Sequence, residues 1–231
     1  MTRTTNARLA GVASVIYITA GIFNELLMYR ATNVEGTAEK LARIADYATD
    51  VRVAIILKLC ECFSAFALAV ALYGITRDED NELAMFGLLC RVAEGVSVAS
   101  LIPNRQALLW LANVRRGVVS GPDVATTNAL GAFLMAPGAP VGSIFFAVGS
   151  ATFSYLLLRG RMVPVSLALW GVFSSVLLIV GLPLQVAGFL TGPLTGYQWV
   201  PAIAFAPVFA LWLLVKGVTV PKGRQARVQS S

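Results

Sequence analysis

The chain has 231 residues, of which 57% are hydrophobic and only 13% are charged. An ordinary soluble domain is about 25% charged, so a water-soluble globule of this size is excluded. The net charge is +6, but the basic residues form no stripe with interleaved aromatic residues, which excludes a nucleic-acid-binding surface. We therefore predict an integral membrane protein, with the lipid bilayer as its first partner.

Residue counts also limit the chemistry of the chain. Histidine is absent, which removes Ser–His and Cys–His nucleophile pairs and zinc sites built on histidine. The three cysteines, Cys60, Cys62 and Cys90, lie inside apolar runs and show no disulfide or metal-ligand spacing. The acidic run over residues 78–82 is a single cluster in a short loop, which favours a solvated loop over a divalent-cation site. We expect no metal and no cofactor.

A helix needs about 20 mainly apolar residues to cross a bilayer, and six stretches of the chain meet this need. They cover residues 9–29, 53–75, 83–110, 127–158, 163–190 and 199–218. Pro103 interrupts the third stretch, while Pro137, Gly138 and Pro140 interrupt the fourth. We expect kinks or short unwound segments there, or a seventh span if the fourth stretch divides. The sequence predicts an all-α bundle of six transmembrane helices, in a single domain over residues 1–221 with a disordered cytoplasmic tail over 222–231.

The distribution of Lys and Arg predicts the orientation in the membrane. If both termini lie on one side, that side carries nine Lys and Arg residues, counting Lys216 at the end of the last span, and the opposite side carries six. The positive-inside rule then places both termini in the cytoplasm.

The connection between the first two spans has a helical pattern of its own. Leu41, Ile44, Tyr47 and Ala48 recur at three- and four-residue spacing within residues 37–50. This pattern predicts a short helix, which either lies on the outer membrane interface or forms an ordinary solvated connector.

Apart from Lys216 at the end of the last span, six charged residues fall inside the predicted spans: Glu25, Lys58, Glu61, Arg91, Glu94 and Arg105. A charge near the bilayer centre costs about 2.5–3.5 kcal/mol, so we expect all six to face the interior of the bundle and to pair. Lys58 and Glu61 are three residues apart, as are Arg91 and Glu94, so each pair can meet on one helix face.

Neutral polar residues accompany these charges in the outward half of the spans. We predict a polar cavity there, with Glu61 and Glu94 at its floor as catalytic residues. The residues predicted to bind a hydrophobic or amphiphilic small molecule are Asn24, Glu25, Lys58, Arg91, Asn104, Arg105, Asn128 and Gln185. The alternative is a set of structural ion pairs that hold the helices in register.

Three functions fit this pattern. An intramembrane enzyme of the cyclase or isomerase type would use a protonated carboxyl of Glu61 or Glu94 as general acid on an amphiphilic or isoprenoid-like substrate. A small proton-coupled transporter would load and release protons on the same groups, although the two halves of the chain show no convincing inverted repeat. A non-catalytic module would bind a lipid or an unspecified partner protein. The sequence favours the enzyme by a narrow margin.

Short stretches along almost the whole chain carry a family resemblance. They are RLAGV at 8–12, AGIFNE at 20–25, AVALY at 69–73, LCRVAE at 89–94, YLLLR at 155–159, MVP at 162–164 and LWLLVKGV at 211–218. On these stretches the chain resembles the bacterial multi-pass membrane proteins grouped as domain of unknown function 4386. The resemblance implies one helical domain in the bacterial inner (cytoplasmic) membrane, with no established activity and with the first span retained in the mature protein.

Overall fold

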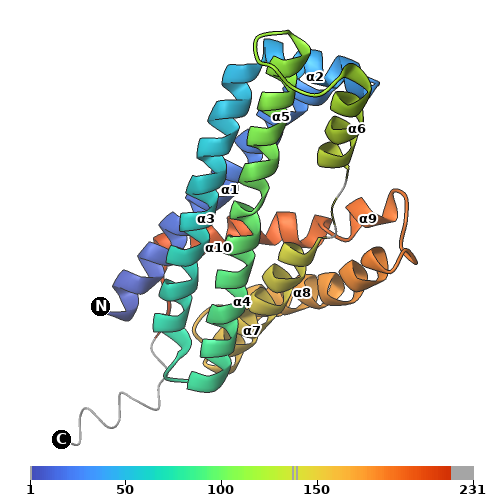
Figure 1. Ribbon diagram of the computed structural model, residues 1–231. Helices are drawn as coiled ribbons and strands as arrows, with labels where there is room; N and C mark the ends of the chain where they lie inside the picture. Colours follow the sequence, from blue (N-terminus) through green and yellow to red (C-terminus); the bar gives the residue numbers. More distant parts are fainter. Residues whose placement is uncertain (1, 137, 139, 220–231) are drawn as a thin grey trace, which may run out of the picture. The chain divides into compact units, whose positions relative to one another are not determined.

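The computed structural model describes residues 2–136, 138 and 140–219, and all regular elements within them are helices (Figure 1). Six helical stretches are long and apolar enough to cross a membrane. They are α1 (Arg3–Thr32), α3 (Ala48–Thr76), α4 (Asn81–Ala99) with α5 (Leu101–Arg115), α7 (Val141–Arg159), α8 (Val165–Val186), and α9 (Leu194–Tyr197) with α10 (Val200–Val215). The prediction of an all-α membrane bundle with six spans is confirmed. The predicted tail over 222–231 lies outside the described residues.

The third predicted span is interrupted where its proline predicts. α4 ends at Ala99 and α5 begins at Leu101. Pro103 has no N–H to donate to the carbonyl group of Ala99, four residues before it, and its ring crowds that carbonyl. The helix therefore loses its regular hydrogen bonding at this point.

The fourth predicted span, over residues 127–158, is interrupted at its run of Pro and Gly as expected, and only its second part is long enough to cross a membrane. This stretch divides into α6 (Val124–Met135) and α7, and Pro140 stands directly before α7, where a proline is tolerated. At about 1.5 Å per residue, the 12 residues of α6 reach about 18 Å, which is too short to cross a bilayer core of about 30 Å. The division therefore adds no seventh span.

The helices form two compact units, which are described separately. Unit 1 lies in the ranges Met1–Ile18, Phe63–Val96 and Pro140–Ser231, and unit 2 in Thr19–Cys62 and Ser97–Ala139. α1, α3 and α4 each contribute residues to both units. A single domain over residues 1–221 stays a prediction.

Unit 1 is built on close helix packing. α7 and α8 lie side by side (Figure 1), and α10 packs against α8. A Cβ atom on Gly11 of α1 would lie 2.9 Å from the backbone nitrogen of Leu214 in α10, so only glycine permits this approach. The main buried core of the unit includes Ala7, Ala10, Leu72, Ile75, Phe153, Leu157 and Leu213.

Unit 2 contains the predicted connector helix, α2 (Thr37–Asp46). Leu41 and Ile44 are fully buried in a core that includes Leu108 and Leu111 of α5, and α2 packs against both α5 and α6. The short helix is thus confirmed. Its apolar side contacts protein, which favours the connector interpretation over a helix that dips its apolar side into the membrane interface.

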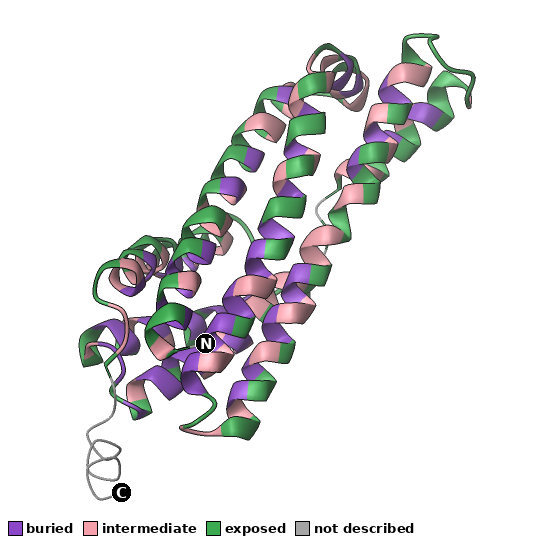
Figure 2. Ribbon diagram, turned by 90° about the vertical axis from the view of Figure 1, so that its left-hand side faces the viewer, coloured by how far each residue is buried: buried purple, intermediate pink, exposed green. Residues whose placement is uncertain are grey.

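Exposed positions run along the long helices, as Figure 2 shows in green. Many of them are large and apolar, such as Phe23, Phe63 and Phe173, with exposed fractions of 55%, 65% and 62%. Monomeric soluble proteins rarely expose apolar surface on this scale. The pattern is that of a chain whose outer surface is covered by lipid.

Candidate functional site

The predicted site residues are divided between the two units. Arg91, Glu94 and Gln185 belong to unit 1. The others belong to unit 2: Asn24, Glu25, Lys58, Glu61, Asn104, Arg105 and Asn128. A single cavity with both carboxylates at its floor therefore stays a prediction.

In unit 2, Lys58 and Glu61 form the ion pair that their spacing predicts. The Nζ atom of Lys58 lies 2.8 Å from the Oε2 atom of Glu61, and the two side chains are 8% and 9% exposed. α1 passes close to this pair, because a Cβ atom on Gly21 would lie 3.7 Å from the Oε1 atom of Glu61. The pair is therefore buried between α3 and α1.

Arg105 is the second buried cation of unit 2. Its Nη1 atom donates to the side-chain oxygen of Asn24 and, at 3.2 Å, to the carbonyl oxygen of Ala54. Asn24 in turn donates to the Oε1 atom of Glu25 at 3.0 Å, and the charges of Glu25 and Glu61 both act on Arg105. We call this group the Arg105 cluster; it consists of Asn24, Glu25, Lys58, Glu61 and Arg105, and its two cations balance its two anions.

The prediction that all six charged residues face the interior is wrong for Glu25. Asn24 is fully buried, whereas Glu25 is exposed. Successive residues of a helix are turned by about 100°, so the interior position taken by Asn24 leaves Glu25 on the outer face, beside the exposed side chains of Ile22 and Leu26. The other five charged residues are buried.

In unit 1, Arg91 and Glu94 form the second predicted pair, with Nη1 and Oε2 2.7 Å apart and both side chains 3% exposed. The hydroxyl group of Tyr17 donates to the Oε1 atom of Glu94 at 2.6 Å. The guanidinium group of Arg91 lies over the rings of Tyr17 and Phe146, at 5.6 and 4.9 Å from their centres. We call Tyr17, Arg91, Glu94 and Phe146 the Glu94 cluster. It joins α1, α4 and α7 within unit 1.

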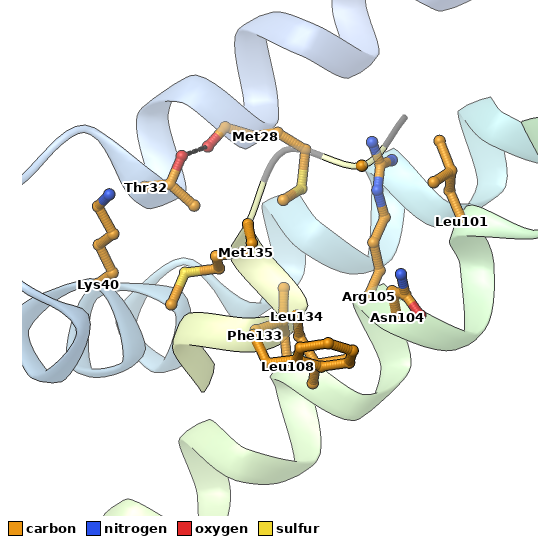
Figure 3. Close-up of a pocket in the computed structure, with 12 residues that line it drawn as sticks. Met28, Thr32, Lys40, Leu101, Asn104, Arg105, Leu108, Phe133, Leu134 and Met135 are labelled. Atoms are coloured by element: carbon orange, nitrogen blue, oxygen red, sulfur yellow. Dashed lines mark hydrogen bonds between the residues drawn. The ribbon is translucent and has the colours of Figure 1, made fainter. Parts of the chain in front are cut away.

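Unit 2 also contains a cavity of about 510 Å³ (Figure 3). α1, α2, α5 and α6 supply its walls, and the segment after α6 completes them. Its apolar lining is Met28, Leu101, Leu108, Phe133, Leu134, Met135, Ala136 and Gly138, and its polar lining is Thr32, Lys40, Asn104 and Arg105. In the view of Figure 3, Lys40 and Arg105 lie at opposite sides, with Met28 and Met135 between them. Of the residues predicted from the sequence, the cavity brings together Asn104 and Arg105.

Two predicted residues have other partners. Asn128 of α6 accepts a hydrogen bond from the Nη1 atom of Arg115 at 3.2 Å. Gln185 of α8 accepts one from the Nε2 atom of Gln198 at 2.8 Å. Each contact joins neighbouring segments of one unit, and neither residue lines the cavity.

The sequence interpretation missed Tyr17 and Lys40. A signal for each was present. Tyr17 stands seven residues before Asn24, which puts both on one face of α1, and Lys40 stands four residues before the buried Ile44 on α2. Helical spacing from a polar or buried neighbour would have found both.

The acidic loop forms ion pairs within unit 1. Arg3 lies 3.0 Å from Asp78, and Arg159 lies 3.3 Å from both Glu79 and Asp80. Within the described part of the chain, no group of three or more His, Cys, Asp or Glu residues is arranged to hold a metal ion.

Six apolar spans, buried ion pairs and a lipid-facing outer surface define a multi-pass membrane protein. Within this class, the family model described as domain of unknown function (DUF4386) matches residues 9–217, so the chain belongs to that family. No curated protein and no solved structure matches the chain. The bacterial inner membrane and the cytoplasmic location of both termini stay predictions.

Proposed function

We propose that the protein is a membrane-embedded binding module that takes an amphiphilic small molecule into the cavity of unit 2. The observation that carries this proposal is the cavity itself, with apolar walls and a cation at each of two opposite sides, Lys40 and Arg105. Cavities of about 300–1,000 Å³ with apolar walls and a few placed polar groups are typical of small-molecule sites. At about 510 Å³, this cavity lies within that range.

The position of the cavity favours a ligand that enters from the membrane. Its lining includes Met28 and Thr32, near the end of α1 that leads into α2. With both termini in the cytoplasm, this end of α1 lies in the outer half of the bilayer. The flexible thioether groups of Met28 and Met135 can adapt to chains of different shape, as an amphiphile-binding wall requires.

An intramembrane enzyme is the second candidate, and the burial of Glu94 beside Tyr17 supports it. A general acid must donate a proton, whereas Glu94 accepts a hydrogen bond from Tyr17 and faces the guanidinium group of Arg91. Glu61 is likewise engaged by Lys58 and does not line the cavity. The catalytic role of either carboxylate stays a prediction, and proton-coupled transport ranks third.

The proposed function is tested by filling the cavity. Leu101 lines it and is 44% exposed, so Leu101→Trp adds bulk to the cavity without entering a packed core. At a ligand concentration 100 times Kd, binding stabilises the wild-type protein by about 2.7 kcal/mol, and we expect this stabilisation to be lost in Leu101→Trp. The measurement is unfolding in nanodiscs with and without a 12-carbon fatty acid, with native mass spectrometry of amphiphiles that co-purify.

Leu59→Trp is the matched control, because Leu59 is 42% exposed, also belongs to unit 2 and lies outside the cavity. It should respond to the fatty acid as the wild type does. Equal responses of the two Trp variants, or a wild type that no amphiphile stabilises, would reject the proposed function.

A further inference from the structure

Lys40 is a cation of the cavity that no carboxylate neutralises within the described residues. It forms no ion pair there, and the residues three and four positions away in the chain are Gly36, Thr37, Arg43 and Ile44. None of these is acidic, so the usual helical ion pair cannot form. The cavity lining also contains no Asp or Glu. Lys40, a half-buried residue of the lining, thus brings a positive charge to the edge of an apolar cavity whose lining holds no counter-charge.

Arg105, at the opposite side of the cavity in Figure 3, is already engaged. It donates to Asn24 and to the carbonyl oxygen of Ala54, and the charges of Glu25 and Glu61 act on it. Of the two cations, Arg105 is therefore the one already held by hydrogen bonds within unit 2. Lys40 is the one whose ammonium group forms no ion pair within the described residues.

The volume limits the size of the ligand. At about 30 Å³ per non-hydrogen atom, the volume of a water molecule in the liquid, the cavity of about 510 Å³ holds roughly 17 such atoms. This is enough for one medium-length hydrocarbon chain with a small headgroup, whereas the two chains of a phospholipid would extend beyond the cavity.

We infer that the ligand is a single-chain amphiphile with one anionic headgroup, either a carboxylate or a phosphate, and that Lys40 binds this headgroup. This inference rests on the proposed function. The hydrocarbon chain lies along Met28 and Met135, which stand between Lys40 and Arg105 in Figure 3. An ammonium–anion hydrogen bond is about twice as strong as a neutral one. The headgroup charge should therefore raise affinity about tenfold over a neutral amphiphile with the same chain.

The test compares probes that differ only in headgroup or in chain number. Laurate and dodecyl phosphate are the anionic single-chain probes, dodecanol is neutral, dodecyltrimethylammonium is cationic, and phosphatidylglycerol is anionic with two chains. Dissociation constants are measured in nanodiscs of zwitterionic lipid by ligand-induced stabilisation. We expect laurate or dodecyl phosphate to bind about tenfold tighter than dodecanol, and the comparison of the two anions identifies the headgroup.

Three variants test whether Lys40 causes the preference for an anionic headgroup. Lys40→Gln should remove the preference for the anion and leave dodecanol binding unchanged, while Lys40→Arg should retain the preference. Arg52→Gln, at an exposed cation of unit 2 that does not line the cavity, should behave as the wild type. Unfolding without ligand checks that each variant is folded.

Each contrary result has a distinct meaning. Equal wild-type affinity for dodecanol and both anions would overturn the headgroup inference and leave the proposed cavity intact; Lys40 would then only extend its ammonium group to the interface. An unchanged preference in Lys40→Gln would also overturn it, as would phosphatidylglycerol binding as tightly as the single-chain anions. Binding of no single-chain probe would reject the inference and the proposed function together.

Discussion

The two units bury the same kind of ion pair in different surroundings. In unit 1, a Cβ atom on Gly149 of α7 would lie only 2.9 Å from the Cγ atom of Arg91, and two aromatic rings cover the guanidinium group. In unit 2, a Cβ atom on Gly21 would lie at an ordinary 3.7 Å from Glu61. Both pairs have i,i+3 spacing, but the Arg91–Glu94 pair has the tighter helix contact and lies under two aromatic rings.

Three-residue spacing on a helix decides whether two charged side chains can pair. The elements packed around the pair decide whether it is closed off or lies beside a cavity. The Glu94 cluster is closed on its own aromatic residues, as expected of a contact that fixes α1, α4 and α7. The Arg105 cluster borders the cavity of unit 2, because Arg105 is one of the residues that line it. The candidate binding site therefore lies beside the Arg105 cluster of unit 2.

The largest expected effect comes from Glu94→Gln. The substitution keeps the size of the side chain and leaves the charge of Arg91 buried without its carboxylate, so we expect the free energy of unfolding to fall by about 3–5 kcal/mol. Unfolding by denaturant in mild detergent measures this loss. A loss below about 1 kcal/mol would contradict the picture of a sealed pair.

The double variant Arg91→Met with Glu94→Leu is the control, because apolar residues of similar volume often replace a buried ion pair without loss. It should recover most of the stability lost in Glu94→Gln. The small molecules that co-purify with the folded double variant also test the enzyme hypothesis. A product present in the wild type and absent in this variant would support catalysis at Glu94.

A smaller loss is expected for Glu61→Gln in unit 2, about 1–3 kcal/mol, the cost of leaving a buried polar group without its partner. The long side chain of Lys58 can move its ammonium group toward water. The same denaturation experiment measures the loss. Glu25→Gln is the control: Glu25 is exposed and Gln can still accept from Asn24, so its effect should stay within about 0.5 kcal/mol. A loss as large as that of Glu94→Gln would remove the distinction between the units.

Much of the fold follows from local sequence patterns. Apolar length predicts the six spans, and three-residue spacing predicts both ion pairs. Helical periodicity likewise predicts the connector helix around Leu41 and Ile44. All of these depend on residues close together in the chain, where helix geometry alone fixes which side chains meet.

The cavity could not be predicted, because it depends on contacts between segments far apart in the chain. Hydropathy places α6 and α7 in one stretch, and the Pro and Gly residues at 137–140 predict an interruption there but not the element against which α6 packs. In the structure α6 packs against α2, and Gly131 permits the approach, since a Cβ atom there would lie 3.0 Å from the side chain of Leu41. Because the sequence did not show that α6 packs against α2, it could not place Lys40 at a cavity.

The smallest expected effect concerns Asp123, which caps the α6 wall of the cavity. Its Oδ1 atom accepts from the backbone N–H of Thr126 at 2.8 Å and its Oδ2 atom from the Thr126 hydroxyl at 3.0 Å. These bonds, the backbone one first, lower the pKa of the exposed Asp123 carboxyl below its ordinary value. The cap is therefore fully present above the ordinary Asp pKa of about 3.9 and is lost as the pH falls through the lowered value.

We expect Asp123→Ala to speed amide hydrogen exchange in the first turn of α6 at neutral pH, because the cap is missing. Asp123→Asn keeps an acceptor oxygen, so at neutral pH it should exchange nearly as the wild type does. When the pH is lowered from about 5 to about 3, across the ordinary Asp pKa, wild-type protection of this turn should fall after correction for the intrinsic rate, whereas the protection in Asp123→Asn should stay constant. A fall of equal size in Asp123→Asn would show that another group loosens α6 in acid, and the wall of the cavity would then depend on contacts other than this cap.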